Sequence, residues 1–173
     1  MEHLKAKIRQ VPDFPKPGIL YYDITTLLRD PVGLREVLDG LTEPFRDQQI
    51  DLVVGIESRG FILGAAVADR LRAGFVPARK LGKLPAGTIQ QSYDLEYGSD
   101  ALEIHQDAIE QGQRVLIVDD LLATGGTARA ALDLVRKTGG EIAGMAFLVE
   151  LQFLGGRARL GDVPLFVALR YTS

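Results

Sequence analysis

The residues best suited to chemistry lie between positions 115 and 127, where an apolar run ends in two adjacent carboxylates, Asp119 and Asp120. A turn of small residues follows and opens a predicted helix; it consists of Ala123, Thr124, Gly125, Gly126 and Thr127. Glycines let backbone N–H groups approach an anion without a Cβ clash. The start of a helix adds unpaired donors and a partial positive charge, and threonine hydroxyls can donate as well. The pattern therefore predicts a phosphate-binding turn.

The two carboxylates limit which phosphate-containing ligands can bind to this turn. The turn lacks the G-x-x-x-x-G-K-[ST] pattern of a P-loop and contains no lysine, and two acidic residues ahead of it would repel a bare triphosphate. They suit a ligand that also offers hydroxyl groups or a Mg²⁺ ion. A ribose 5-phosphate meets this requirement, with its phosphate on the turn and its 2′- and 3′-hydroxyls at Asp119 and Asp120. In the alternative interpretation the two aspartates only cap the strand-to-helix turn.

Alternating strands and helices are predicted to position this turn. Continuous apolar runs, typical of parallel strands covered on both faces, predict strands at residues 52–56, 75–78, 114–119, 142–151 and 165–169. The pattern implies a mostly parallel, twisted α/β sheet flanked by helices, which binds ligands at the carboxyl ends of its strands. Neighbouring strand residues point to opposite faces, so both carboxylates can face one ligand only if the strand ends by Asp120.

Helices are predicted between these strands and after residue 30. Asp30 and Pro31 form a helix start, and a helix over about residues 126–138 ends at two glycines. Residues 81–100 contain several glycines and a proline and little apolar periodicity. Connections of that length are usually lids or disordered, so this segment is predicted to be a flexible loop over the site.

Composition excludes several classes of protein. The chain has 173 residues, enough for one domain, and 46% of them are hydrophobic. The formal charge of −3 argues against nucleic-acid binding, and the lack of cysteine excludes disulfides, zinc–thiolate sites and a thiol nucleophile. No secretory signal or membrane-spanning run is apparent. We expect a cytoplasmic protein with no nucleic-acid or membrane partner, and assign no metal or catalytic role to His3 or His105.

The segment at residues 115–127 resembles the signature that binds phosphoribosyl pyrophosphate (PRPP) in type I phosphoribosyltransferases. Nearly the whole chain resembles the adenine phosphoribosyltransferases in the order and spacing of its motifs. These motifs begin at Asp13 (DFPKPG), Asp23 (DIT), Glu57 (ESRGF), Arg79 (RK, then GKLP), Ser92 (SYDLEYG) and Leu148 (LVEL).

The resemblance implies the type I phosphoribosyltransferase fold, with residues 1–173 as a single domain. It also implies transfer of ribose 5-phosphate from PRPP to N9 of adenine, with release of pyrophosphate. By match, Asp119 and Asp120 hold the ribose hydroxyls, and the turn from Ala123 to Thr127 holds the 5′-phosphate. Mg²⁺ is the expected cofactor, and it bridges pyrophosphate and ribose oxygens with few direct protein ligands, as is usual for a cation that keeps its waters.

The resemblance also implies a site for the pyrophosphate. Ser58 and Arg59 match the loop that takes this group, and that loop often carries a non-proline cis peptide, which here would fall at Glu57–Ser58. A cation at a helix start opposes the helix dipole, so a bound anion explains Arg59 better than a surface charge does. A basic cluster, Arg79, Lys80 and Lys83, matches residues that reach pyrophosphate across a dimer interface, which implies a homodimer.

A hood over the base and a lid complete the implied site. The hood is residues 1–30, with Leu20, Tyr21 and Tyr22 against the base and Leu121 on its opposite face. The family usually has arginine or lysine at the position of Tyr22, where this chain departs from the pattern. In the lid, residues 81–100, Glu96 matches the catalytic glutamate that handles the purine N7 proton. Tyr97 matches a residue that helps to close the lid.

Three other functions stay open at this level, and the third of them is a bare nucleotide-binding module. A phosphoribosyltransferase for hypoxanthine, guanine or xanthine differs only in the hydrogen-bond polarity that the base site demands. A non-catalytic PRPP-sensing regulator would keep the fold and bind nucleic acid, but this chain shows neither an added DNA-binding module nor a strongly basic face. The loop motif around Glu96 favours the adenine enzymes.

Overall fold

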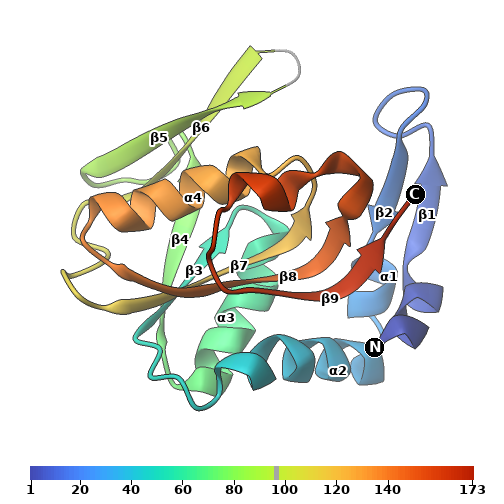
Figure 1. Cartoon of the computed structure of the whole chain (residues 1–173), viewed down its shortest axis with the longest axis horizontal. Coiled ribbons are helices and arrows are strands. Elements are labelled where there is room, and N and C mark those ends of the chain that lie inside the picture. The colour runs from blue at the N-terminus through green and yellow to red at the C-terminus, as the bar shows by residue number, and fades with distance from the viewer. Residues whose placement is uncertain (96–97) are drawn as a thin grey trace.

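A computed structural model describes residues 1–95 and 98–173. Its main feature is a seven-stranded sheet of order β5-β6-β4-β3-β7-β8-β9. The parallel part consists of β4 (Gly74–Lys80), β3 (Leu52–Ile56), β7 (Arg114–Leu122), β8 (Glu141–Leu151) and β9 (Leu165–Tyr171). This confirms the predicted mostly parallel sheet and its five apolar strands (Figure 1).

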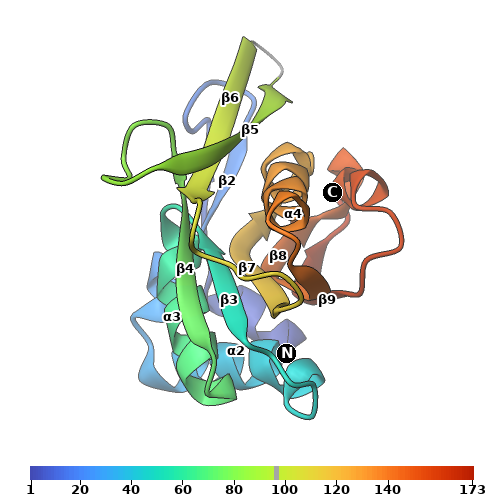
Figure 2. The same cartoon turned by 90° about the vertical axis from the view of Figure 1, so that its left-hand side faces the viewer.

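Helices cover both faces of the parallel strands. One face packs on α2 (Pro31–Thr42) and α3 (Arg59–Leu71), and the other packs on α4 (Gly126–Lys137) (Figure 2). Successive residues of β7 enter opposite cores, with Leu116 in the first and Ile117 in the second. Burial on both faces explains why these strands are continuous apolar runs.

The helix starts predicted from the sequence are confirmed. The Asp30 side chain accepts a hydrogen bond from the Gly33 N–H at 3.0 Å, and Pro31 is the first residue of α2. This carboxylate satisfies a backbone donor that has no partner within the helix. α3 begins directly at Arg59, and α4 begins at Gly126 inside the predicted phosphate turn. Both helix starts therefore lie at the carboxyl ends of the strands that precede them.

The prediction that residues 81–100 form a loop is wrong for residues 88–95 and 98–100, which lie in strands. β5 (Thr88–Leu95) and β6 (Gly98–His105) form an antiparallel hairpin that joins β4 through Arg79 and Lys80. Ile89 and Tyr93 pack against the core under α4 and alternate with exposed polar residues, so the apolar signal is weak. Glu96 and Tyr97 lie outside the described residues.

The N-terminal segment, called the N-terminal unit below, contains a two-stranded sheet of its own. A 3₁₀ helix, η1 (Glu2–Lys7), is followed by β1 (Arg9–Pro12) and β2 (Leu20–Asp23), which pair antiparallel, and by α1 (Thr25–Leu28). Figure 1 shows β1 and β2 beside the carboxyl ends of β8 and β9. The remaining short 3₁₀ helices are η2 (Glu43–Phe45), η3 (Gln152–Leu154) and η4 (Gly156–Arg159). No helix within the described ranges is long and apolar enough to cross a membrane.

Candidate active site

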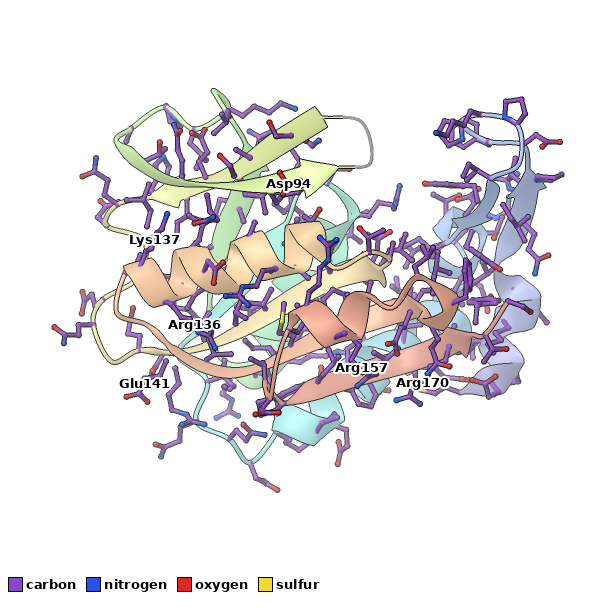
Figure 3. All side chains as sticks on the ribbon, turned by 45° about the horizontal axis from the view of Figure 1, so that its top comes forward. Asp94, Arg136, Lys137, Glu141, Arg157 and Arg170 are labelled. Atoms are coloured by element: carbon purple, nitrogen blue, oxygen red, sulfur yellow. The ribbon has the colours of Figure 1, made fainter. Side chains whose placement is uncertain are left out.

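A cavity of about 560 Å³ opens at the carboxyl ends of β3 and β7, between α3, α4 and the β5–β6 hairpin. The hairpin lies along α4: the Lys137 ammonium donates to the Gln90 carbonyl oxygen at 2.9 Å, and Asp94 lies over the start of the helix (Figure 3). The lining residues are Glu57, Ser58, Arg59, Lys80, Lys83, Tyr93, Asp100, Leu102, Asp119, Asp120, Leu121, Leu122, Ala123, Thr124, Gly125, Gly126, Thr127 and Ala128. Segments far apart in the sequence therefore meet at one site.

Asp119 and Asp120 both line the cavity, although β7 continues to Leu122. The expected end of the strand by Asp120 is therefore not observed, yet both residues lie at the same cavity. Pairing of β7 with β3 stops at Val118, which leaves this edge of β7 open toward the cavity. The Asp120 N–H donates to Asp119 Oδ1 at 2.8 Å. A Cβ on Gly60 would lie 2.7 Å from that same oxygen, so the start of α3 approaches Asp119 closely only because residue 60 is glycine.

The two carboxylates are in different electrostatic environments. Burial and the nearby Asp120 charge raise the pKa of Asp119 well above its usual range. Asp120 instead forms an ion pair with Nε of Arg59. Burial opposes the charge on Arg59, but the Asp120 carboxylate outweighs it, and the arginine pKa is raised. Arg59 is a single cation beside two carboxyl groups, so carboxyl oxygens remain that can accept hydrogen bonds from the hydroxyl groups of a ligand.

Arg59 also connects the cavity to the N-terminal unit. Its Nη1 donates to the Tyr21 hydroxyl, and the guanidinium carbon lies 5.5 Å from the centre of the Tyr21 ring. One arginine therefore contacts both a predicted ribose-binding residue and a predicted base-binding residue. The peptide bond between Glu57 and Ser58, just before Arg59, is cis, as predicted.

The predicted phosphate turn has a backbone geometry that suits an anion. Gly125 has a φ of +83°, and it is the N-cap residue of α4. All five residues of the turn line the cavity. The N–H groups at the start of α4 have no partners within the helix, so they are available to an anion. Tyr93 on β5 lies beside the turn, because a Cβ on Gly126 would be 3.3 Å from its ring.

Glu57, to which no role was assigned from the sequence, holds the basic cluster together. Glu57 accepts from the Lys83 ammonium at 2.6 Å, the Lys80 backbone N–H at 3.0 Å and Arg79 Nε at 3.3 Å. Burial opposes the charge on Glu57, but the bond from Lys83 and the backbone bond lower its pKa. Lys80 and Lys83 line the cavity; Arg79 does not, and it lies 6.0 Å from the Phe61 ring centre. The nearness of Glu57 to residues 79–83 comes from the pairing of β3 with β4, which its local sequence does not signal.

The predicted base-binding residues separate into two groups. Leu121 lines the cavity, and Tyr21 accepts a hydrogen bond from Arg59, which also lines it. Leu20 is 41% exposed and is not among the lining residues. The Tyr22 ring packs in the core, with its centre 4.1 Å from that of Tyr171, and Tyr22 is not among the lining residues. Tyr21 and Tyr22 are neighbours on β2, so they point to opposite faces.

Tyr93 and Asp100 on the hairpin also belong to the site, although no role was assigned to them from the sequence. The Tyr93 hydroxyl lies 3.2 Å from Asp100 Oδ2, and Asp100 forms an ion pair with Lys80. The bond from Lys80 lowers the pKa of Asp100. Ile89, Gln91 and Tyr93 are half-buried and alternate with exposed residues, as in a strand with one covered face. In the sequence, the only sign of this alternation is the spacing of Ile89 and Tyr93.

The parallel sheet, the acidic pair and the glycine turn at a helix start together define a phosphoribosyltransferase. The family model described as "Phosphoribosyl transferase domain" matches residues 24–162. The chain is 61% identical to the adenine phosphoribosyltransferase of Koribacter versatilis, over 98% of this chain and 93% of that protein. It is 63% identical to the adenine phosphoribosyltransferase of Acidobacterium capsulatum, over 99% of this chain and 95% of that protein.

Solved structures agree with these relatives. The adenine phosphoribosyltransferase of Rhodothermus marinus superposes with a TM-score of 0.94 at 57% identity, over 98% of this chain and 97% of the other. The enzyme of Giardia lamblia, solved with 9-deazaadenine, superposes with a TM-score of 0.92 at 39% identity, over 98% and 97%. The chain belongs to the phosphoribosyltransferase family and, within it, to the adenine phosphoribosyltransferases.

Proposed function

We propose that the protein converts adenine and PRPP to AMP and pyrophosphate, a purine salvage reaction. One observation carries this proposal: a single cavity joins the glycine turn, the acidic pair and the loop of Ser58 and Arg59. These are the three surfaces that a 5′-phosphate, a ribose and a pyrophosphate need. The relatives named above are all adenine phosphoribosyltransferases, which supports adenine as the acceptor.

In this proposal the chain acts by holding its substrates and stabilising charge. The backbone N–H groups of the turn bind the 5′-phosphate, and the ribose hydroxyls donate to Asp119 and Asp120. Ser58 and Arg59 bind the pyrophosphate. The C1′–O bond to pyrophosphate breaks as the bond from C1′ to N9 of adenine forms, and the base loses a proton. Positive groups near the leaving pyrophosphate stabilise its developing charge, and fixed geometry favours the attack.

Arg59 has a second part in this scheme. It is paired with Asp120 and Tyr21, so binding of a ribose hydroxyl at Asp120 competes with the guanidinium. An arginine released from Asp120 is free to pair with pyrophosphate oxygens, for which its planar fork is suited. The arginine then moves from one anionic partner to another as PRPP enters.

We propose that residues 1–30 form a hood over the base and residues 81–100 a lid over the reacting atoms. The aromatic face of Tyr21 and the side chain of Leu121 hold the base between them in this scheme. Glu96 handles the purine N7 proton, and Tyr97 helps to close the lid. Exclusion of water is chemically necessary, since water would intercept a ribosyl oxocarbenium ion.

The residues present fit a Mg²⁺ ion that is held mainly through its substrate. Within residues 1–95 and 98–173 no group of three His, Cys, Asp or Glu side chains could hold a metal alone. The oxygen donors that line the cavity, including Asp119 and Asp120, suit a hard cation that keeps several waters. Bound Mg²⁺ would neutralise pyrophosphate charge in the complex. We further propose a cytoplasmic homodimer in which Arg79, Lys80 and Lys83 serve pyrophosphate across the interface.

The test is a spectrophotometric assay of the purified protein with PRPP and Mg²⁺, with adenine, hypoxanthine, guanine and xanthine offered separately. We expect turnover of adenine alone and, for Glu96→Ala, a kcat lower by about 10²- to 10⁴-fold. Preference for an oxopurine would overturn the adenine assignment. Binding of PRPP without turnover of any base would overturn the enzyme assignment and favour a PRPP sensor.

A further inference from the structure

We propose that the ion pair between Glu150 and Arg157 is a positioning device that holds the phosphate turn from behind, through the backbone of Gly156. Neither side chain lines the cavity, so their action on PRPP would be indirect. The inference rests on the proposed function, because it takes the turn at residues 123–127 to bind the 5′-phosphate.

Glu150 is a buried charge at the edge of the sheet where the site lies. It lies near the end of β8, in register with Leu122 of β7 and Arg170 of β9. Its side chain is 4% exposed. Arg157 donates two hydrogen bonds to it, from Nε to Oε1 at 3.0 Å and from a terminal nitrogen to Oε2 at 2.7 Å. Such bidentate pairs fix orientation as well as distance.

The residue before Arg157 touches the phosphate turn directly. A Cβ on Gly156 would lie 2.1 Å from the Ala123 carbonyl oxygen and 2.8 Å from the Gly125 backbone nitrogen. Reciprocally, a Cβ on Gly125 would lie 2.4 Å from the Gly156 carbonyl oxygen. The two backbones are therefore packed together with no room for a side chain. Any shift of Gly156 changes the support of the peptides whose N–H groups face the phosphate.

Removing Arg157 would leave the buried Glu150 carboxylate without a well-placed cation. Arg170 is the other cation near Glu150 in the described structure, and its Nε lies 3.6 Å away, beyond good hydrogen-bond distance. Figure 3 shows Arg157 and Arg170 together on the C-terminal segment. A buried charge that loses its partner is strongly unfavourable. The 3₁₀ turn η4 would then move to resolve it, taking Gly156 with it.

The geometry also supplies a matched control. Arg170 is on β9 and contacts the same carboxylate, but it is not part of the turn that packs on Gly125. Arg170→Gln removes a cation near Glu150 and leaves η4 in place. Arg157→Gln removes the bidentate pair, and Arg157→Lys keeps the charge but offers a compact ammonium in place of the planar fork.

The experiment measures melting temperature, kcat, KM for PRPP and for adenine, and inhibition constants for ribose 5-phosphate and for pyrophosphate. We expect Arg157→Gln to raise the KM for PRPP and the inhibition constant of ribose 5-phosphate by roughly tenfold or more. Adenine KM and pyrophosphate inhibition should change by less than about twofold to threefold. Arg157→Lys should show the same split at a smaller size, and Arg170→Gln should resemble the wild type.

Equal weakening of ribose 5-phosphate and pyrophosphate would overturn the proposal, since it would show a general loss of structure. So would an Arg157→Gln variant that binds ribose 5-phosphate as the wild type does. If Arg157→Gln does not fold, the split in Arg157→Lys decides. A wild-type protein that neither binds ribose 5-phosphate nor uses PRPP would instead overturn the proposed function, so the two failures are distinguishable.

Discussion

Replacing Gly125 with alanine would bring two separate penalties to the phosphate turn. The first is conformational: its φ is +83°, where an L side chain costs about 1–2 kcal/mol. The second is steric, because the new Cβ would lie 2.4 Å from the Gly156 carbonyl oxygen. Ordinary contacts of a Cβ begin at 3.4 Å, so one of the two backbones must shift by about 3.4 − 2.4 = 1.0 Å. Misplacement by about 1 Å can cost roughly 100-fold in rate.

Gly112 provides a control for the first penalty alone. Its φ is +85°, and a Cβ there would meet nothing within 4 Å. Gly112→Ala should therefore lower the melting temperature by about 2–8 °C and leave the kinetics unchanged. Gly125→Ala should lower the melting temperature by at least as much and should lower kcat/KM for PRPP by about 100-fold. Gly126→Ala should be milder, because its nearest contacts would be at 3.3 Å and its φ is not positive.

The assay is initial-rate kinetics with PRPP varied at saturating adenine, together with thermal melting of the same three variants. The reasoning is refuted if Gly125→Ala keeps its kcat/KM for PRPP within about threefold of Gly112→Ala. That result would mean that the turn and Gly156 can separate without loss of phosphate binding. A loss of activity in Gly112→Ala equal to that in Gly125→Ala would show instead that backbone strain alone is responsible.

Three further predictions concern the acidic pair and the aromatic residues. Tyr21→Phe removes the acceptor of the Arg59 bond and keeps the ring, so it should raise the KM for PRPP about threefold to tenfold; an equal rise for adenine would contradict this. Tyr22→Phe should leave the KM for adenine within about twofold, since the ring is buried in the core, whereas Tyr22→Ala should cost about 3–5 kcal/mol of stability in chemical unfolding. Burial and the Asp120 charge raise the pKa of Asp119 in the folded protein above its unfolded value of 3.8. The contribution of this carboxyl to the free energy of unfolding is therefore fully present below pH 3.8, where the group is protonated, and is lost as pH rises through the folded pKa. Asp119→Asn should therefore melt higher than the wild type at neutral pH, with the difference narrowing toward about pH 4, while PRPP turnover is lost; a melting difference independent of pH would contradict this origin.

Local patterns were enough to predict the central sheet and two helix starts. Runs such as residues 114–119 are continuous apolar segments because both faces of the sheet are covered, and Asp30 followed by Pro31 satisfies the needs of a helix start within a few residues. The β5–β6 hairpin was missed because Ile89 and Tyr93 are separated by polar residues, and their burial depends on α4, which is distant in the sequence. Pairing with β4 likewise joins segments that no local signal connects.

The candidate site shows the same division. Glu57 was overlooked because the three groups that donate to it follow more than 20 residues later. The two tyrosines of β2 show the same limit. The alternation of strand residues implies that Tyr21 and Tyr22 face opposite sides, but which side faces the cavity depends on how the N-terminal unit packs against Tyr171.

The chemistry of the phosphate turn could be predicted from adjacent residues alone. A glycine-rich turn, a helix start and two preceding carboxylates are properties of adjacent residues, so they predict an anion site before any long-range contact is known. The surroundings of that turn, in contrast, depend on long-range packing. Gly156 meets Gly125 from a later part of the chain, and Arg59 meets Asp120 across 61 positions. Such contacts depend on how the whole chain packs, because strand register and helix placement are settled by burial of the two cores together.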